Sequence, residues 1–299
     1  MILRSLRKAS ALALAFVTAS VLGLPAAAPE KAQFVGSYKW KRADHKLGGF
    51  SGIELSSDGK SFTAISDQAG IVSGTLHRDN GRISDVVTEQ KGHLRDERGR
   101  RLKGKYSDAE GLAVRSDGRI FVSFEHQHRV WAYLTLKAAA WLPRPKQFKA
   151  LQPNSGLEAL AVDPKDRLYA IPERSGKLTR PFPVWRYAKG KWTQPFALRR
   201  EGGFLPVGAD FDTEGNLYLL ERTFTGFGFK SRVRRFFLDD DAVTAEETLL
   251  ETAILQHDNL EGLSVWKDAD GDIRLTMISD DNFNDFQRTE FVEYRVTRR

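Results

Sequence analysis

The chain has 299 residues, no cysteine, and 46 lysines and arginines against 39 acidic residues, which gives a formal net charge of +7. Hydrophobic residues make up 41% and charged residues 28%, a composition that is typical of a folded globular protein and excludes intrinsic disorder and a collagen-like chain. The absence of thiolates excludes disulfide scaffolds, zinc ribbons and iron–sulfur clusters.

Residues 1–28 are predicted to be a secretory signal peptide. Arg4, Arg7 and Lys8 precede an apolar run at 11–24, and small residues follow it. The apolar run is short for a membrane span, and an uncleaved membrane anchor is the alternative. Cleavage removes three positive charges and lowers the net charge from +7 to +4. We therefore expect a periplasmic or secreted protein with no stable membrane span after cleavage and no nucleic-acid partner.

The rest of the chain repeats one pattern five times. A short alternating apolar run is followed by a turn rich in Asp and Gly, and then by a second apolar run that ends in a carboxylate. The five copies are Ser51–Asp67, Glu110–Glu125, Glu158–Glu173, Val207–Glu221 and Glu261–Asp280. Alternating apolar residues predict strands and the turns predict hairpins, so each copy is expected to be a β-hairpin.

More strand-like sequence follows each hairpin, which makes each repeat about four antiparallel strands, the size of one β-propeller blade. The last repeat is too short for a fourth strand, whereas residues 34–42 form a predicted strand that precedes the first repeat. If this N-terminal strand pairs with the last repeat, no sheet edge is left exposed. We therefore predict an all-β fold, a single five-bladed propeller over residues 29–299 that is closed by an N-terminal strand. A sixth blade within 67–110 and an open two-sheet sandwich are the alternatives.

Hairpin geometry predicts that eight carboxylates gather at one mouth of the central channel, because the start of the first strand and the end of the second lie at the same end. These candidate metal ligands are Glu110, Glu158 and Glu261 at strand starts, and Asp67, Glu125, Glu173, Glu221 and Asp280 at strand ends. Eight such charges repel one another, so either some take up protons or a cation binds. Oxygen ligands favour a hard cation, Ca²⁺ ahead of Mg²⁺ or Mn²⁺. The alternative is that the strand-end acids only cap turns.

Basic and imidazole groups follow several of these acids. Arg174 and Arg222 are candidates for binding an anionic substrate, with pairing to carboxylates of neighbouring blades as the alternative. His126 is a candidate general acid or base. For His126 and His128, a surface role is the alternative.

The strongest run of charge is Lys91–Lys105, where seven basic residues face two acidic ones, a net +5. It leads directly into Asp108 and Glu110, so its end is expected at the acidic mouth. The run is interpreted either as a solvated surface loop or as a flexible basic lid that attracts an anionic ligand.

Several of the repeat motifs resemble the phytase-like β-propeller family, whose domain is described as esterase-like activity of phytase. These motifs are DAEGLAV with SDGRIFVSFE, NSGLEALAV with LYAIPER, and NLEGLSV with ISDDNF. The resemblance spans about residues 48–285 and includes GGFSGIELSSDG followed by AISD. It implies a bacterial, exported propeller associated with calcium and with phosphoesterase or esterase activity. The clustered aspartates and lysines of an alkaline β-propeller phytase are not present.

Together these features predict a metal-dependent hydrolase that acts on a small anionic or ester substrate. Glu110, Glu158 and Glu261 would serve as metal ligands or general bases. The alternative is a non-catalytic propeller that binds a ligand, an envelope glycan or a protein partner. A hydrolase requires the carboxylates to converge beside an open cleft, whereas a non-catalytic propeller does not.

Overall fold

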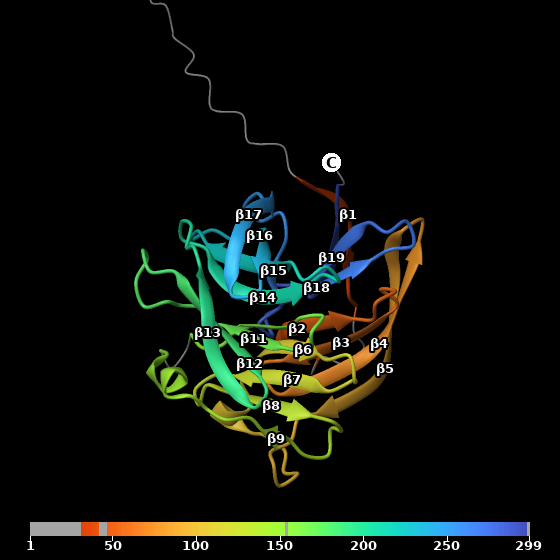
Figure 1. Ribbon diagram of the computed structural model, residues 1–299. Coiled ribbons are helices and arrows are strands. Elements are labelled where there is room, and N and C mark those ends of the chain that lie inside the picture. The colour runs from red at the N-terminus through yellow and green to blue at the C-terminus, as the bar shows by residue number, and fades with distance from the viewer. Residues whose placement is uncertain (1–30, 42–46, 153–154, 298–299) are drawn as a thin grey trace, which may run out of the picture.

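The computed structural model describes residues 31–41, 47–152 and 155–297, so the predicted signal peptide lies outside the described residues. The described residues form twenty strands in five four-stranded antiparallel sheets, with two short 3-10 helices, η1 (Gly104–Tyr106) and η2 (Lys146–Ala150). The sheets are the blades of a β-propeller (Figure 1). In the described part of the chain, no helix has the length and apolar character needed to cross a membrane.

The first four blades are each built from four consecutive strands. Blade 1 contains β2 (Phe50–Leu55), β3 (Ser61–Ser66), β4 (Gly70–Asp79) and β5 (Arg82–His93). Blade 2 contains β6 (Ala109–Val114), β7 (Ile120–Phe124), β8 (Arg129–Tyr133) and β9 (Ala140–Trp141). Blade 3 contains β10 (Ala159–Val162), β11 (Leu168–Ile171), β12 (Phe182–Ala188) and β13 (Lys191–Leu198). Blade 4 contains β14 (Leu205–Phe211), β15 (Leu217–Phe224), β16 (Phe229–Asp239) and β17 (Ala242–Glu251).

Blade 5 joins the two ends of the chain. It contains β18 (Asn259–Lys267), β19 (Ile273–Asp280), β20 (Glu290–Val296) and β1 (Ala32–Lys39). Strand β1 pairs antiparallel with β20, so the first strand of the chain covers what would otherwise be an open sheet edge (Figure 1). The predicted five-bladed propeller with N-terminal closure is confirmed. The interval 67–110 holds the outer strands of blade 1 and a short hairpin rather than a sixth blade.

The turns between the first two strands of each blade follow from local sequence. Four of them place a glycine in the left-handed region, with φ between 70° and 87°, at Gly59, Gly118, Gly215 and Gly271. Blade 3 has Asp166 at the corresponding place, with φ of 59°. Aspartate tolerates this conformation better than most residues because its short side chain bonds locally to the backbone.

Among the described residues, five buried hydrophobic clusters hold the blades together, one at each interface between consecutive blades. The interface between blades 5 and 1 has the same character as the others. There Trp40 stacks on Phe50 with ring centroids 5.3 Å apart. Hydrophobic burial therefore continues around the whole ring, including the seam where the chain ends meet.

The inner strands β2, β6, β10, β14 and β18 approach one another so closely that the channel is nearly closed at its waist. Each carries Gly or Ala at the equivalent place. A Cβ on Gly208 would lie 2.6 Å from the carbonyl oxygen of Glu261, and one on Gly52 would lie 2.9 Å from Leu112. The free space at the waist is only about 10 Å³, about that of one water molecule. The two ends of the channel are therefore separate environments.

Candidate functional site

β-bulges change the direction of acidic side chains at the start of two inner strands. The strand pairing shifts between Ala109 and Leu112 in β6, and between Leu260 and Gly262 in β18. A bulged residue leaves the regular ladder, which re-aims its side chain. Glu110 and Glu261 lie within these shifts, and both face acidic groups from other blades across the channel mouth.

The structure brings seven of the eight predicted carboxylates into one group, together with Asp108, which was not predicted as a ligand. We call this group the acid cluster. Its members interact electrostatically across blades 1, 2, 3 and 5, and they are Asp67, Asp108, Glu110, Glu125, Glu158, Glu173, Glu261 and Asp280. The predicted convergence at one channel mouth therefore holds for all but Glu221.

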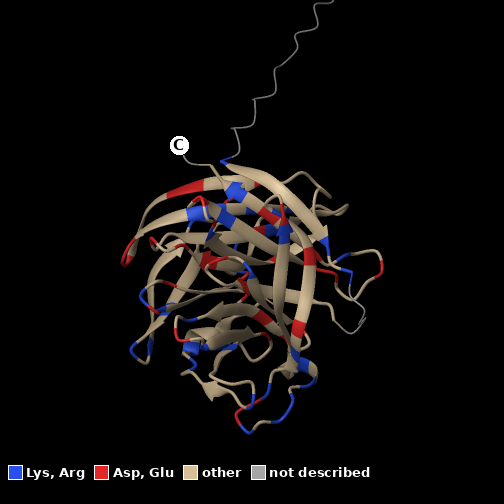
Figure 2. Cartoon of the chain, turned by 90° about the vertical axis from the view of Figure 1, so that its right-hand side faces the viewer, with Lys and Arg blue, Asp and Glu red and all other residues tan. Residues whose placement is uncertain are grey.

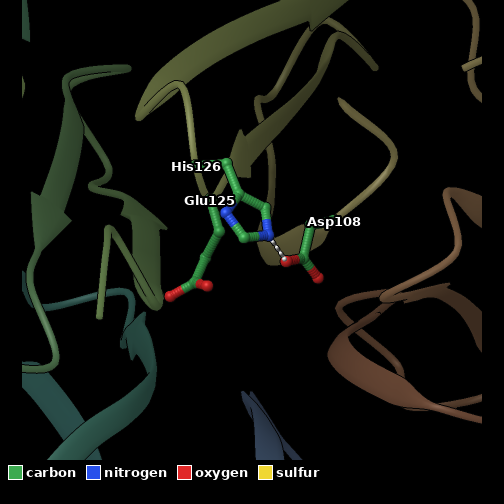
Figure 3. Close-up of side chains that lie close together, drawn as sticks. All are labelled: Asp108, Glu125 and His126. Atoms are coloured by element: carbon green, nitrogen blue, oxygen red, sulfur yellow. Dashed lines mark ion pairs between the residues drawn. The ribbon is translucent and has the colours of Figure 1, made fainter. Parts of the chain in front are cut away.

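Two sets of three side chains within the described residues lie close enough to hold a metal ion, and they share Glu125. One set is Glu110, Glu125 and Glu158, and the other is Asp108, Glu125 and His126. In each set the ligand atoms lie within 4.8 Å of one another. Figure 3 shows the second set, with the His126 ring between the two carboxylates and its Nε2 3.1 Å from Asp108 Oδ2. The cluster therefore offers carboxylate oxygens and one imidazole within the reach of a single cation.

The acid cluster cannot be fully ionised at neutral pH without a compensating charge. Burial, followed by repulsion from neighbouring carboxylates, raises the pKa of Asp67 to about 7 and that of Asp280 to about 8. Burial also raises the pKa of Glu110 and Glu158 well above the ordinary glutamate value, again with help from nearby acids. These groups must either keep protons or share a cation.

Glu221 does not join the acid cluster, which corrects the prediction that all five strand-end acids meet there. Its carboxylate is fully buried between Arg232 and Arg234, at distances of 2.7–2.9 Å from their guanidinium nitrogens. Strand β15 continues to Phe224, so Glu221 is an internal strand residue rather than a strand end. Side chains alternate along a strand, and Glu221 shares with Leu219 the face of blade 4 that packs against blade 3.

Arg222, the next residue, points toward the channel mouth instead. Its Nη1 donates to the carboxylate of Glu261 and to Asn259 Oδ1, and Asn259 Nδ2 donates to the same Glu261 oxygen at 2.8 Å. Arg222 was predicted to bind an anionic substrate, but the structure pairs it with a carboxylate of the next blade. It neutralises one acid of the cluster. Arg174 stays 51% exposed, with its Nε 3.4 Å from Glu173.

The two histidines beside Glu125 have different environments. His126 adopts a left-handed backbone conformation, with φ of 56°, and its partly exposed ring bonds to Asp108. His128 is buried behind Gly156, where a Cβ would come within 2.3 Å of its Nδ1. Burial lowers the pKa of His128, so this ring is neutral at physiological pH. His126 is therefore the imidazole that faces the acid cluster.

The sequence interpretation missed two features of the channel. Asp108 belongs to the cluster, and its signal was available in the acidic residue that opens the DAEGL motif. At the opposite end of the channel, the partly exposed Glu54 in β2 and the buried Asp210 in β14 form an acidic pair. Burial raises the pKa of Asp210 to about 7, and burial with repulsion from Asp210 raises that of Glu54. No turn or strand-end motif marks this pair.

The sequence matches the Phytase-like family, described as esterase-like activity of phytase, over residues 45–283. Because the match covers most of the chain, the protein belongs to this family. A search of curated proteins finds none that matches the sequence.

Several solved structures are similar to this chain. They include PQQ-bound aldose sugar dehydrogenase from Streptomyces coelicolor, which has 14% identity, covers 91% of this chain and 100% of the other, and has a TM-score of 0.48. Regucalcin, a calcium-binding protein from Agrobacterium tumefaciens, has 14% identity, coverages of 89% and 96%, and a TM-score of 0.48. A gluconolactonase from Xanthomonas campestris has 14% identity, coverages of 82% and 72%, and a TM-score of 0.43. At this level of similarity, none of them bears on the chemistry of the site.

Proposed function

We propose that the protein is an exported, metal-dependent hydrolase of phosphate or carboxylate esters whose cation is bound at the acid cluster. The observation that most supports this proposal is the convergence of Glu110, Glu125 and Glu158, whose oxygens lie within 4.8 Å of one another. Two oxygens bound to one Ca²⁺ at roughly 2.3–2.6 Å can be about 5 Å apart, so this spacing fits calcium. The proposal of export rests on the signal-peptide pattern of residues 1–28.

The chemistry of the donors also fits a hard cation. Within the described residues, Glu110 and Glu158 form no ion pair with a basic side chain, because Arg222 is taken by Glu261. Asp67 Oδ1 is buried and has no hydrogen-bond partner in the same part of the chain. Carboxylates that are crowded, desolvated and without a basic partner are typical of a cation site made of oxygen ligands.

In this proposal the protein residues hold the ion, orient the substrate and move a proton. Glu110, Glu125 and Glu158 hold the ion, which when bound supplies Lewis-acid stabilisation of the ester oxygen. Asp108 accepts a hydrogen bond from His126 Nε2–H and thereby leaves Nδ1 free to accept a proton from the attacking water. The exposed guanidinium of Arg174 can bind an anionic group of the substrate.

The test is a hydrolase assay with p-nitrophenyl phosphate and short-chain p-nitrophenyl esters, in the presence of chelator and after adding back Ca²⁺, Mg²⁺ or Mn²⁺. We expect turnover that chelator abolishes and Ca²⁺ restores. The double variant Glu110→Gln, Glu158→Gln should lose at least about 100-fold in kcat/KM, because two ligands are lost together. The control Glu214→Gln changes an exposed glutamate that pairs with Lys267 outside the cluster and should keep full activity.

Two results would contradict the proposal. Activity that survives the double substitution would place the chemistry elsewhere. A wild-type protein that is stabilised by Ca²⁺ but hydrolyses none of these esters would instead favour a non-catalytic, ligand-binding propeller.

A further inference from the structure

The basic run Lys91–Lys105 is a hairpin docked on blade 2 rather than a free lid. Leu94 and Leu102 are buried in the hydrophobic cluster between blades 1 and 2, which anchors both sides of the hairpin. Tyr133 Oη in β8 donates to the carbonyl oxygen of Arg95 at 2.9 Å. The hairpin lies beside β9 at the outer edge of the molecule, at the bottom of Figures 1 and 2, and it carries both signs of charge.

A cavity of about 780 Å³ lies between this hairpin and the outer strands β8 and β9. We call it the blade-2 pocket. Its size is that of sites that hold small organic ligands. Strand β9 has only two residues, so the hairpin rather than a full outer strand forms one wall. The pocket contains no member of the acid cluster and does not depend on the proposed hydrolytic function.

Three buried hydrogen-bond donors on side chains that line the pocket have no acceptor among the described residues. They are Arg129 Nη1, Trp131 Nε1 and Arg144 Nε. Arg129 and Trp131 are only 5% and 6% exposed. Guanidinium and indole nitrogens donate and cannot accept, so a ligand that satisfies these groups must bring acceptor oxygens.

The charges of the side chains that line the pocket also favour an anionic ligand. Two carboxylates, Asp96 and Glu97, face five basic side chains, which are Arg100, Arg101, Lys103, Arg129 and Arg144. Asp96 is already neutralised by Arg100, whose Nε lies 2.7 Å from its Oδ2. The pocket therefore has a surplus of positive charge.

Arg129 is held in a fixed orientation before any ligand arrives. Its Nη2 donates to the carbonyl oxygen of Tyr106 at 2.7 Å, and its guanidinium stacks on Phe124 and Trp131 at 4.2 and 4.3 Å from the ring centroids. Burial lowers the pKa of Arg129 to about 10, so it is still a cation at neutral pH. A preorganised cation of this kind loses little conformational freedom when it binds an anion.

Aromatic side chains form the remaining wall. Trp131 and Trp141 are directly opposite each other in the β8–β9 pair, and both line the pocket. Trp141 is 60% exposed, which is unusual for so large an apolar side chain. Aromatic faces of this size are suited to packing against a flat apolar group.

We propose that the blade-2 pocket binds a small organic anion that carries an aromatic ring. Its carboxylate or phosphate oxygens accept hydrogen bonds from Arg129, Trp131 and Arg144, and its ring packs against Trp141. The buried donors without acceptors call for the anionic group of this ligand, and the exposed aromatic surface in the same cavity calls for its ring.

The test is isothermal titration calorimetry of the purified protein with benzoate, phenyl phosphate, inorganic phosphate and benzyl alcohol. We expect benzoate or phenyl phosphate to bind, inorganic phosphate to bind at least tenfold more weakly, and benzyl alcohol not to bind. The tighter of the first two identifies the anionic group as carboxylate or phosphate.

Substitutions then test where the ligand binds. Arg129 is buried and its substitution could unfold the protein, so the variants are Arg144→Gln and Trp141→Ala at more exposed positions. Thermal unfolding checks that both variants fold. Each should weaken binding at least tenfold, whereas Arg119→Gln, in a turn of the same blade, should not. Binding should persist in the variant Glu110→Gln, Glu158→Gln. The proposal would be overturned if neither aromatic anion binds, or if the Arg144 and Trp141 variants bind as tightly as the wild type. Loss of binding in the acid-cluster variant would overturn it as well.

Discussion

Glu221 and Arg222 are consecutive residues of β15, yet they lie in opposite environments. Glu221 is buried between two arginines on the face of blade 4 that packs against blade 3, and Arg222 reaches the acid cluster. Because side chains alternate across a strand, a shift of one position exchanges these two roles. At the scale of single residues, side-chain direction therefore decides whether a carboxylate belongs to the site or to the packed interface between two blades.

Replacing Glu221 by Gln should destabilise the protein by about 3–5 kcal/mol, because Arg232 and Arg234 would remain buried without their counter-charge. Urea unfolding measures this loss. Glu214→Gln is the matched control, since its exposed pair with Lys267 should contribute less than about 1 kcal/mol. Equal effects of the two substitutions would contradict the buried-pair interpretation.

At the scale of elements, the five inner strands are similar in sequence because they face the same constraint. Strands β2, β6, β14 and β18 have a bulge near their start with Gly at or just after it, and β10 has Ala159 at the equivalent place without a bulge. At these positions the neighbouring inner strand passes closely. The same positions aim Glu110 and Glu261 at the mouth. The close approach of strands and the placement of the acids are therefore two consequences of one local motif.

Gly208→Ala should cost about 1–3 kcal/mol or more, because the new Cβ would lie 2.6 Å from the backbone oxygen of Glu261, which cannot move independently of β18. The matched control is Gly203→Ala, whose Cβ would meet nothing closer than 3.6 Å. Thermal unfolding of both variants checks this prediction. A Gly208 variant as stable as the control would show that the inner strands can separate without cost.

At the scale of the whole molecule, the acid cluster makes folding depend on pH, and also on the proposed cation, because its members come from four blades. Folding raises the pKa of Asp67 to about 7 and of Asp280 to about 8, so these groups bind protons more tightly in the folded chain. Their stabilising contribution is complete below the ordinary aspartate pKa and is lost as pH rises through 7 and 8. The buried neutral His128 acts in the opposite sense, but only below its ordinary pKa.

In chelator, the free energy of unfolding should therefore fall between about pH 7 and pH 9, by about 1 kcal/mol or more from Asp280 alone. Adding Ca²⁺ should raise the melting temperature, and more at pH 9 than at pH 7, because protons compete with the cation. Thermal unfolding at the two pH values measures both effects. The variant Glu110→Gln, Glu158→Gln should show a smaller response to Ca²⁺. Stability that increases over this range in chelator would contradict the proposed protonation of the cluster.

Much of the fold was predictable because its signals are local. Alternating apolar residues and the glycine at each hairpin turn specify the strands within windows of about ten residues. The acids of the mouth were predictable for the same reason, since Glu110, Glu158 and Glu261 occupy one repeat position. Glu221 was predicted wrongly because the longer β15 moved the strand end beyond it.

By itself the sequence determined a closed five-bladed propeller with acids at one mouth, since repeated local patterns and one spare strand leave little choice. Only the tertiary structure decided which acids meet, that Arg222 neutralises Glu261, and that Glu54 faces Asp210 at the other end of the channel. It also brought the basic hairpin against Arg129 and Trp141 to form the blade-2 pocket. The physical reason is that these contacts join segments distant in sequence, so they depend on how the blades close around the ring and not on local strand periodicity.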